Sequence, residues 1–333
     1  MPFLHDTFPT LAQTLPHVSL GDGPTPVRPL DSLGFSSEVW VKDESVFGNG
    51  GWGGNKVRKL EWIIPDVSRL GKDTMLTVGG IGTHWGLAAA LYGHEHGLRT
   101  VLAMTDQPID DHVRDQQRRL KASPATLHYL HTQRRLKLAT PVLMARYARK
   151  RSLPYYLPAG GSSAVGALGY VETALEIAAQ VAAGELPEPA YLVSAVGSGG
   201  TAAGLALGLR LAGLKTRVIG IVVNDVFPLD APMIADLATE TELLLRDRGA
   251  GLPDVDLGPD DVDMRLAWLG KTYGDPTPLA LETLALARDK EGLELEPVYT
   301  AKALGAIRDL DAQGFFADGP VLFLHTHGPR SDV

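Results

Sequence analysis

Short apolar runs alternate with helical patterns along almost the whole chain, and this alternation restricts the possible folds more than any other feature of the sequence. Several of the runs are continuously apolar, which is typical of strands that are covered on both faces. Strands that alternate with helices favour a parallel or mostly parallel sheet with helices on both sides. The predicted strands are 39–42, 74–78, 100–104, 125–129, 191–196, 218–223 and 321–324. The predicted helices lie near 83–96, 110–121, 140–151, 166–183, 201–212, 231–247, 276–291 and 301–312.

The length of 333 residues exceeds one ordinary domain and favours two sub-domains or one large α/β unit. The chain has no apolar run of about 18 residues, which argues against a membrane span. Residues 1–6 lack the basic and apolar pattern of a secretory signal. A net charge of −8 without a long basic stripe argues against a nucleic-acid partner. The absence of cysteine excludes disulfides, thiolate catalysis and cysteine-ligated metals. The lack of cysteine does not itself fix the compartment. We expect a cytoplasmic protein that holds no metal.

A glycine-rich run from Gly48 to Gly54 ends at Lys56, and this junction is the first candidate site. Apolar residues recur after it with the spacing of one helix face, and Asn55 is a favourable N-cap for that helix. The glycines let the backbone approach a ligand closely. Burial and a helix N-terminus both lower the pKa of an amine, so Lys56 is suited to reach a carbonyl in its uncharged form. The alternative is a solvated lysine in the first turn of a surface helix.

A second glycine turn, Gly197 to Thr201, follows the predicted strand 191–196. Its backbone N–H groups and two hydroxyls lie at a helix N-terminus, an arrangement that binds phosphate. A glycine turn without a ligand is one alternative. A dinucleotide site in an NAD-dependent oxidoreductase is another, because the turn and Ala202 fit the glycine fingerprint and Asp225 follows about 20 residues on. That fit leaves Lys56 and the other glycine turns unexplained.

A third glycine turn, from Gly79 to Gly86, precedes an alanine-rich helix. Its exposed amides and the hydroxyl of Thr83 suit a carboxylate. His84 could act as a base or donate a hydrogen bond to a ligand oxygen, although a structural or capping histidine explains it equally well. Tyr273 and Tyr299 each begin a turn before a helix, and either could be a core aromatic residue with its hydroxyl at the surface.

Taken together, these segments resemble the fold-type II pyridoxal-phosphate enzymes, in the branch that contains 1-aminocyclopropane-1-carboxylate (ACC) deaminase and D-cysteine desulfhydrase. The motifs occur in the family's order and span most of the chain, although residues 226–270 carry little of the match. They are Gly53–Glu61, Val78–Ile81, Gly160–Ser162, Gly166–Glu172, Gly197–Thr201, Tyr273–Gly274, Asp289–Thr300 and His325–Thr326.

The resemblance implies an α/β fold of the tryptophan synthase β type. Its two domains are open, twisted, mostly parallel sheets with helices on both faces. The large domain, which binds pyridoxal phosphate, is expected at 1–59 and 159–333, and the small inserted domain at 60–158. The resemblance also implies a homodimer that acts on a small amino acid.

The same resemblance implies roles for the candidate residues. Lys56 matches the lysine that bonds pyridoxal 5'-phosphate as an internal aldimine, and the turn 197–201 matches the phosphate cradle. Tyr273 and Tyr299 match two tyrosines around the cofactor and substrate, and Thr83 matches a serine that contacts substrate and could transfer a proton. The predicted catalytic residues are therefore Lys56, Thr83, Tyr273 and Tyr299. The predicted cofactor-binding residues are Asn55, Lys56, His84, Gly197, Ser198, Gly199, Gly200, Thr201 and Thr300.

The chain departs from the family's pattern at two places. The family commonly has Ser-Asn followed by Gln or His where this chain has Thr83, His84 and Trp85. His84 thus takes the location of an asparagine that usually contacts the phenolic oxygen of the cofactor. His327 stands in a segment that is usually rich in glycine. These departures leave the expected cofactor unchanged, but they affect which substrate the site would accept.

Thr300 bears on the type of reaction. In the family that the chain resembles, this position faces the pyridine nitrogen of the cofactor. ACC deaminase carries a glutamate there, which keeps the nitrogen protonated. A threonine shares only a neutral hydrogen bond, which favours expulsion of a leaving group from the β-carbon over ring opening. The alternative is that Thr300 caps a helix that begins at Ala301.

We therefore expect a lyase that converts D-cysteine to pyruvate, sulfide and ammonia by α,β-elimination. Ring opening of the ACC deaminase type is the first alternative. A non-catalytic homologue that binds pyridoxal phosphate, or an NAD-binding oxidoreductase, is the second.

Overall fold

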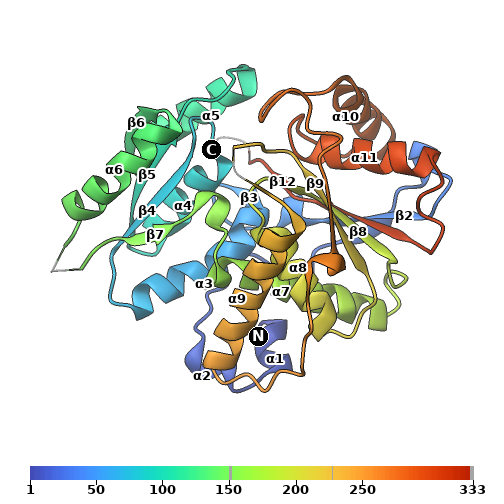
Figure 1. The fold of residues 1–333 in the computed structure, drawn as a ribbon, viewed down its shortest axis with the longest axis horizontal. Helices are drawn as coiled ribbons and strands as arrows, with labels where there is room; N and C mark the ends of the chain where they lie inside the picture. Colours follow the sequence, from blue (N-terminus) through green and yellow to red (C-terminus); the bar gives the residue numbers. More distant parts are fainter. Residues whose placement is uncertain (150–151, 227, 331–333) are drawn as a thin grey trace.

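The computed structural model describes residues 1–149, 152–226 and 228–330. These residues form two large sheets that lie side by side, each with helices packed against it (Figure 1). A two-stranded ribbon of β3 (Gly53–Gly54) and β12 (His327–Gly328) lies between the sheets. The predicted α/β class with mostly parallel sheets is confirmed. No helix in the described ranges is long and apolar enough to cross a membrane.

The larger sheet has six strands in the order β1-β2-β11-β8-β9-β10. Neighbouring strands are parallel except for β1, which pairs antiparallel with β2. The strands are β1 (Val27–Pro29), β2 (Val39–Asp43), β8 (Tyr191–Val196), β9 (Arg217–Val222), β10 (Val262–Arg265) and β11 (Val321–His325).

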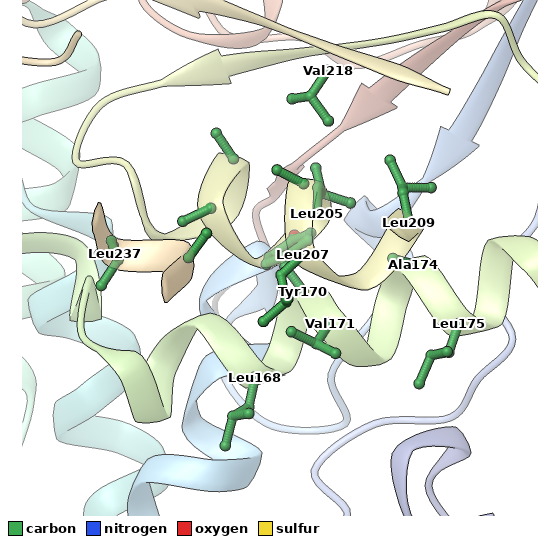
Figure 2. Close-up of a cluster of buried hydrophobic side chains, with 14 of the residues drawn as sticks. Leu168, Tyr170, Val171, Ala174, Leu175, Leu205, Leu207, Leu209, Val218 and Leu237 are labelled. Atoms are coloured by element: carbon green, nitrogen blue, oxygen red, sulfur yellow. The ribbon is translucent and has the colours of Figure 1, made fainter. Parts of the chain in front are cut away.

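Helices cover both faces of this sheet. On one face lie α7 (Ala164–Ala182), α8 (Gly200–Leu211) and α9 (Ala231–Asp247), and on the other lie α10 (Pro278–Glu291) and α11 (Thr300–Ala312). Leu192 and Val218 pack on the first side, whereas their chain neighbours Val193 and Ile219 pack on the second. Figure 2 shows the core between α7 and α8 on the first side. Burial on both faces explains why the strands are continuously apolar in sequence.

The smaller sheet has four parallel strands in the order β6-β5-β4-β7. They are β4 (Thr74–Gly80), β5 (Arg99–Thr105), β6 (Thr126–His131) and β7 (Tyr155–Leu157). One face packs against α3 (Asn55–Arg69), α4 (His84–Glu95) and α5 (Asp111–Ala122), and the other against α6 (Gln133–Arg146). The sheet lies within the predicted range 60–158, and the domain boundaries themselves remain a prediction.

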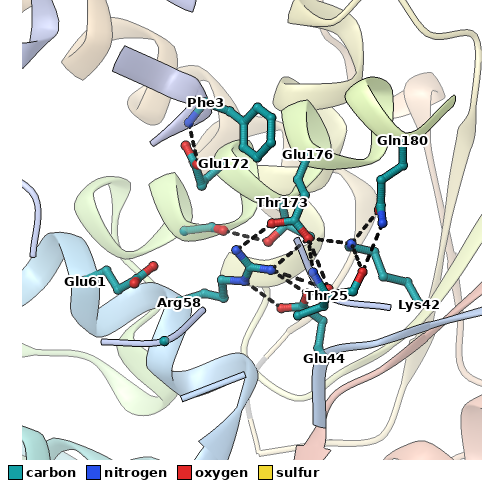
Figure 3. Close-up of polar contacts among 12 residues, drawn as sticks. Phe3, Thr25, Lys42, Glu44, Arg58, Glu61, Glu172, Thr173, Glu176 and Gln180 are labelled. Carbon is teal, nitrogen blue, oxygen red and sulfur yellow. Dashed lines mark hydrogen bonds and ion pairs between the residues drawn. The ribbon is translucent and has the colours of Figure 1, made fainter. Parts of the chain in front are cut away.

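Helix α3 carries the candidate lysine in its first turn and is anchored to α7 by close packing and buried charge. A Cβ added at Gly169 would lie 2.3 Å from the backbone oxygen of Arg58, so the two helices pack closely at this glycine. The Arg58 guanidinium pairs with Glu44 and Glu176, each at 2.9 Å, and Glu176 also pairs with Lys42 at 2.6 Å (Figure 3). These four side chains are each at most 3% exposed. The start of α3 is thus held in place from inside the protein.

Several short elements were not predicted. They are β1, β3, β7, β10, β12, the helices α1 (Phe3–Thr7) and α2 (Leu11–Thr14), and the 3-10 turns Asp31–Leu33, Glu44–Val46, Ala159–Gly161 and Pro259–Asp261. The predicted helix 140–151 is wrong at its start, because Thr132 caps a helix that begins at Gln133 and keeps Pro141 inside it. Residues 150 and 151 of that prediction lie outside the described residues.

Candidate active site

Lys56 lies in the first turn of α3, directly behind the ribbon of β3 and β12. The helix begins at Asn55, and the N-cap is Gly54, whose φ of 84° requires glycine. The prediction that Asn55 is the N-cap is therefore wrong. The backbone N–H of Asn55 instead donates to the Thr326 carbonyl at 3.2 Å, which joins the start of α3 to the C-terminal segment.

The amine of Lys56 is electrostatically prepared for nucleophilic chemistry. Burial lowers its pKa from 10.5 to about 8, and the negative charge of Glu296 opposes this effect without cancelling it. A lysine with a pKa near 8 is about 10% uncharged at pH 7, whereas an ordinary exposed lysine is almost fully protonated. Uncharged amine is the form that attacks a carbonyl.

Lys59 is a second buried lysine that sequence reasoning missed. Its Nζ donates to the backbone oxygen of Gly160 at 3.0 Å. Burial, and then the charge of Lys56, hold the pKa of Lys59 well below its usual value. It is only 1% exposed, and buried ammonium groups generally need an anionic partner. The spacing of three residues from Lys56, which places both amines on one helix face, was the available signal.

The turn from Gly197 to Thr201 follows the end of β8 and runs into the first residues of α8, as predicted from the sequence. Ser162 comes from another glycine-containing segment, and its Oγ accepts from Gly200 N at 3.0 Å and donates to Ser198 Oγ at 2.9 Å. A Cβ added at Gly200 would lie 2.8 Å from Ser162 Oγ and 3.1 Å from Lys59 Nζ. The turn therefore brings a helix N-terminus, two serine hydroxyls and a buried lysine together, which is a donor set that fits a phosphate group.

Tyr273 and Tyr299 come together although they lie on different segments. Their hydroxyl oxygens are 2.7 Å apart, and burial raises the pKa of both phenols. Tyr299 also borders the phosphate-type turn, since a Cβ at Gly197 would lie 2.6 Å from its ring. The carboxylate of Asp225 accepts from Tyr273 N at 3.0 Å and from Thr272 Oγ1 at 3.2 Å. Asp225 thus fixes the Tyr273 loop, a role different from the ribose contact considered in the dinucleotide interpretation.

Glu296 is a second residue that sequence reasoning missed. Its carboxylate accepts from the N–H groups of Val298, Tyr299 and Thr300 at 2.6–2.9 Å. The hydroxyl of Thr300 in turn accepts from Glu296 N at 3.0 Å. The helix α11 begins at Thr300 and not at Ala301, and the Glu296 carboxylate satisfies the N–H of Thr300 and those of the two residues before it. This reciprocal arrangement holds Thr300, which is 1% exposed, in a fixed position.

Thr83 and His84 lie at the start of α4. Thr83 is the N-cap, with its Oγ1 accepting from Gly86 N at 3.1 Å, and within the described ranges no hydrogen bond joins this hydroxyl to Lys56. His84 Nε2 lies 2.7 Å from His112 Nε2. Burial, the neighbouring histidines and then the charge of Lys56 hold the pKa of His84 well below its usual value. Lys56 and His84 therefore belong to one electrostatic environment.

Comparisons with known proteins show the family to which the chain belongs. A family model described as pyridoxal-phosphate dependent enzyme matches residues 18–327. The chain is 34% identical over 331 residues to D-cysteine desulfhydrase of Yersinia enterocolitica, covering 96% of this chain and 95% of the relative. It is also 34% identical over 329 residues to D-cysteine desulfhydrase of Salmonella choleraesuis, covering 94% of each protein. Among solved structures, the crystal structure of an ACC deaminase homologue aligns with a TM-score of 0.81 at 25% identity, covering 98% of this chain and 95% of that one.

Proposed function

The chain belongs to the family of pyridoxal-phosphate-dependent enzymes, and from this membership we propose that it is a lyase that converts D-cysteine to pyruvate, sulfide and ammonia. The observation that supports this most is the half-buried amine of Lys56, whose pKa is lowered to about 8. It lies on the same helix as Lys59, whose Nζ is next to the turn 197–201. The 34% identity to proteins named D-cysteine desulfhydrase, over nearly the whole length of both chains, supports the substrate.

The residues of the site fit pyridoxal phosphate. The turn 197–201, Ser162 and Lys59 would hold the phosphate, because they present N–H, O–H and ammonium donors to one place. Lys56 would bond the aldehyde carbon of the cofactor. When bound, the cofactor supplies an electron sink for the electron pair left at Cα when the α-proton departs.

The protein's own groups then bind the substrate and move protons. The amine of Lys56 takes the α-proton at Nζ, for which its lowered pKa keeps an uncharged fraction available near neutral pH. The hydroxyls of Tyr273 and Tyr299, 2.7 Å apart, form a pair that passes a proton between them. Thr83 and the amides at the start of α4 orient the substrate carboxylate.

The surroundings of Thr300 favour elimination over ring opening. A carboxylate facing the ring nitrogen would hold a proton there and strengthen the electron sink. The nearby carboxylate of Glu296 accepts hydrogen bonds from three backbone N–H groups of the turn that leads into α11. These bonds orient the carboxylate toward that turn. Thr300 offers only a neutral hydroxyl. This arrangement suits a substrate that expels a leaving group from Cβ as the α-proton departs.

Three alternatives have weaker support. The ACC deaminase homologue that aligns with this chain is less similar in sequence, at 25% identity, than the desulfhydrases. A non-catalytic homologue would have no need for an amine whose pKa is lowered to about 8. The oxidoreductase alternative assigned Asp225 to the ribose of NAD. In the structure the carboxylate of Asp225 instead accepts hydrogen bonds from Thr272 and Tyr273.

The proposed function is tested by assaying D-cysteine, β-chloro-D-alanine and ACC side by side with the cofactor-loaded protein. We expect pyruvate and ammonia from the first two, with sulfide from D-cysteine and chloride from β-chloro-D-alanine, and no 2-oxobutanoate from ACC. Efficient formation of 2-oxobutanoate would show that the ring-opening alternative is correct. Binding of all three compounds without any product would favour the non-catalytic homologue.

A separate prediction concerns the turn 197–201, which would hold the phosphate. Replacing Gly200 with valine is expected to weaken pyridoxal-phosphate binding roughly 5- to 100-fold, because the new side chain would crowd Ser162 Oγ and Lys59 Nζ. Absorbance titration of the cofactor-free protein measures the affinity. Gly251→Val is the matched control, since nothing lies within 4 Å of a Cβ at that position. Equal affinities in the two variants would mean that the turn 197–201 does not hold the phosphate.

We further infer a cytoplasmic homodimer that acts on a small amino acid and binds neither membrane nor nucleic acid. The assembly is inferred from the family resemblance, and the chain's net charge of −8 is consistent with the lack of a nucleic-acid partner. Sedimentation that fits only a monomer at micromolar concentration would rule out the homodimer.

A further inference from the structure

Three histidine rings gather beside the candidate lysine. They are His84 of α4, His112 of α5 and His327 of β12, with ring centroids 4.9–5.9 Å apart. Trp52 of the glycine-rich loop packs against His84 at 4.9 Å and against His327 at 6.2 Å. Across the described ranges no group of three or more histidines and acids could hold a metal ion, so these rings are available for proton chemistry.

His84 and His112 are joined by a hydrogen bond between their Nε2 atoms, 2.7 Å apart. Both atoms cannot carry a hydrogen in this bond, because one must donate and the other must accept. The two rings therefore share one proton. Their Nδ1 atoms have no hydrogen-bond partner in the described part of the chain. A proton that enters at the Nδ1 of one ring can leave from the Nδ1 of the other, with the shared proton crossing between them.

The two ends of this pair face different surroundings. His112 is a partly exposed residue in the first turn of α5 and can exchange protons with water. His84 directly follows Thr83 at the start of α4, where the proposed function places the substrate carboxylate. The pair therefore connects solvent to the substrate side of the site.

The titratable groups around His84 either carry a positive charge or gain one when they bind a proton. They come from α3, α5 and β12, and those that act on it most strongly are His327, His112, Lys56 and Arg119. Burial and these neighbours hold the pKa of His84 well below its ordinary value, and the pKa of His327 falls to about 3, so these two rings are uncharged near neutral pH. A substrate carboxylate would add the negative charge that this environment lacks and would favour uptake of a proton by the pair.

We propose that His112 and His84 form a proton relay from solvent to the leaving group on Cβ, and that the relay extends the enzyme's substrates to D-amino acids with a β-hydroxyl, such as D-serine. This inference rests on the proposed lyase function. A thiol has a pKa of about 8.5 and departs readily as a thiolate. Water has a pKa of about 15.7, so a hydroxyl leaves only if it receives a proton. A relay is therefore needed for D-serine and is of little use for D-cysteine.

The proton transfer accounts for every atom. Lys56 takes the α-proton, and the Cβ–O bond breaks with its electron pair going to oxygen. The oxygen takes a proton from His84 and leaves as water. His84 is reprotonated along the 2.7 Å bond by His112, which takes a proton from solvent. Hydrolysis of the remaining three-carbon fragment gives pyruvate and ammonia, so no oxidant or reductant is required.

The kinetic test compares D-serine with D-cysteine in His112→Ala. The ratio of kcat/KM for D-serine to that for D-cysteine should fall roughly 100-fold, the usual contribution of a general acid, and added imidazole should restore it. His128→Ala is the matched control, because His128 also bonds through Nε2, to Tyr147 at 2.8 Å, but lies on β6. If His112 served only in packing, the substitution would lower kcat/KM for both substrates equally, and imidazole would not restore it.

The outcomes separate this inference from the proposed function. Wild-type protein that converts D-cysteine but not D-serine would overturn the relay and leave the lyase function standing. Wild-type protein that converts neither would contradict the lyase function itself. A ratio that is unchanged in His112→Ala would also overturn the relay.

A second readout needs no turnover. In the cofactor-free protein, ring-nitrogen-resolved NMR should detect a strongly deshielded proton shared by two imidazoles. This signal should be lost in His112→Ala and kept in His128→Ala. Its absence from the wild-type spectrum would mean that the rings do not share a proton and would overturn the relay.

Discussion

Replacing Lys56 with alanine is expected to lower kcat for D-cysteine roughly 10³-fold or more, while the protein stays folded. Lys56 bonds the cofactor and moves the α-proton in the proposed function, so its loss removes both contributions together. The fold should survive because the charged form of this amine is already disfavoured by burial, as its lowered pKa of about 8 indicates.

Steady-state release of pyruvate measures this loss, and circular dichroism checks the fold. Lys290→Ala is the matched control, because Lys290 is an exposed lysine in the last turn of α10. A Lys56 variant that keeps its turnover within tenfold of the wild type would exclude Lys56 from the chemistry.

Replacing Glu176 with glutamine is expected to destabilise the protein by about 3–5 kcal/mol. Burial opposes ionisation of this carboxyl, but Lys42 and Arg58 hold its pKa below the ordinary value. Its oxygens accept from Lys42 Nζ at 2.6 Å and from Arg58 Nη2 at 3.0 Å (Figure 3). With glutamine, Arg58 would keep its ion pair with Glu44, whereas Lys42 would keep only the neutral acceptors of Thr25 and Gln180 among the described residues.

The free energy of unfolding in urea measures this effect. Asp289→Asn is the control, since Asp289 pairs with Arg288 on the surface and such exposed pairs contribute about 0–1 kcal/mol. A loss below about 1 kcal/mol in Glu176→Gln would mean that the network contributes little to stability. Because Arg58 lies two residues after Lys56 on α3, we also expect weaker cofactor binding in the Glu176 variant.

The fold was predictable because both sheets are covered on both faces, which leaves continuous apolar strands and amphipathic helices in the sequence. The short elements were not, since β1, β7 and β10 have three or four residues and too little pattern to identify them. The start of α6 was missed because a proline inside a helix looks like a helix start when only local sequence is considered.

The site was predictable where glycines mark it, at Lys56 and at the turn 197–201. Lys59 and Glu296 were missed because a lysine or glutamate is usually solvated, and only the folded structure shows that both are buried. The pairing of His84 with His112 joins residues 28 positions apart on two helices. No local pattern in the sequence predicts such a contact.

The most direct test of the account is to identify the lysine that bonds the cofactor. Borohydride reduction of the cofactor-loaded protein fixes that bond, and proteolysis with mass spectrometry locates it. We predict loss of the visible absorption band and a pyridoxyl-phosphate group on Lys56, because no hydrogen bond engages its amine among the described residues, whereas Lys59 Nζ donates to Gly160 and would serve the phosphate. A cofactor group on Lys59, or a colourless protein in which no lysine is modified, would contradict the account.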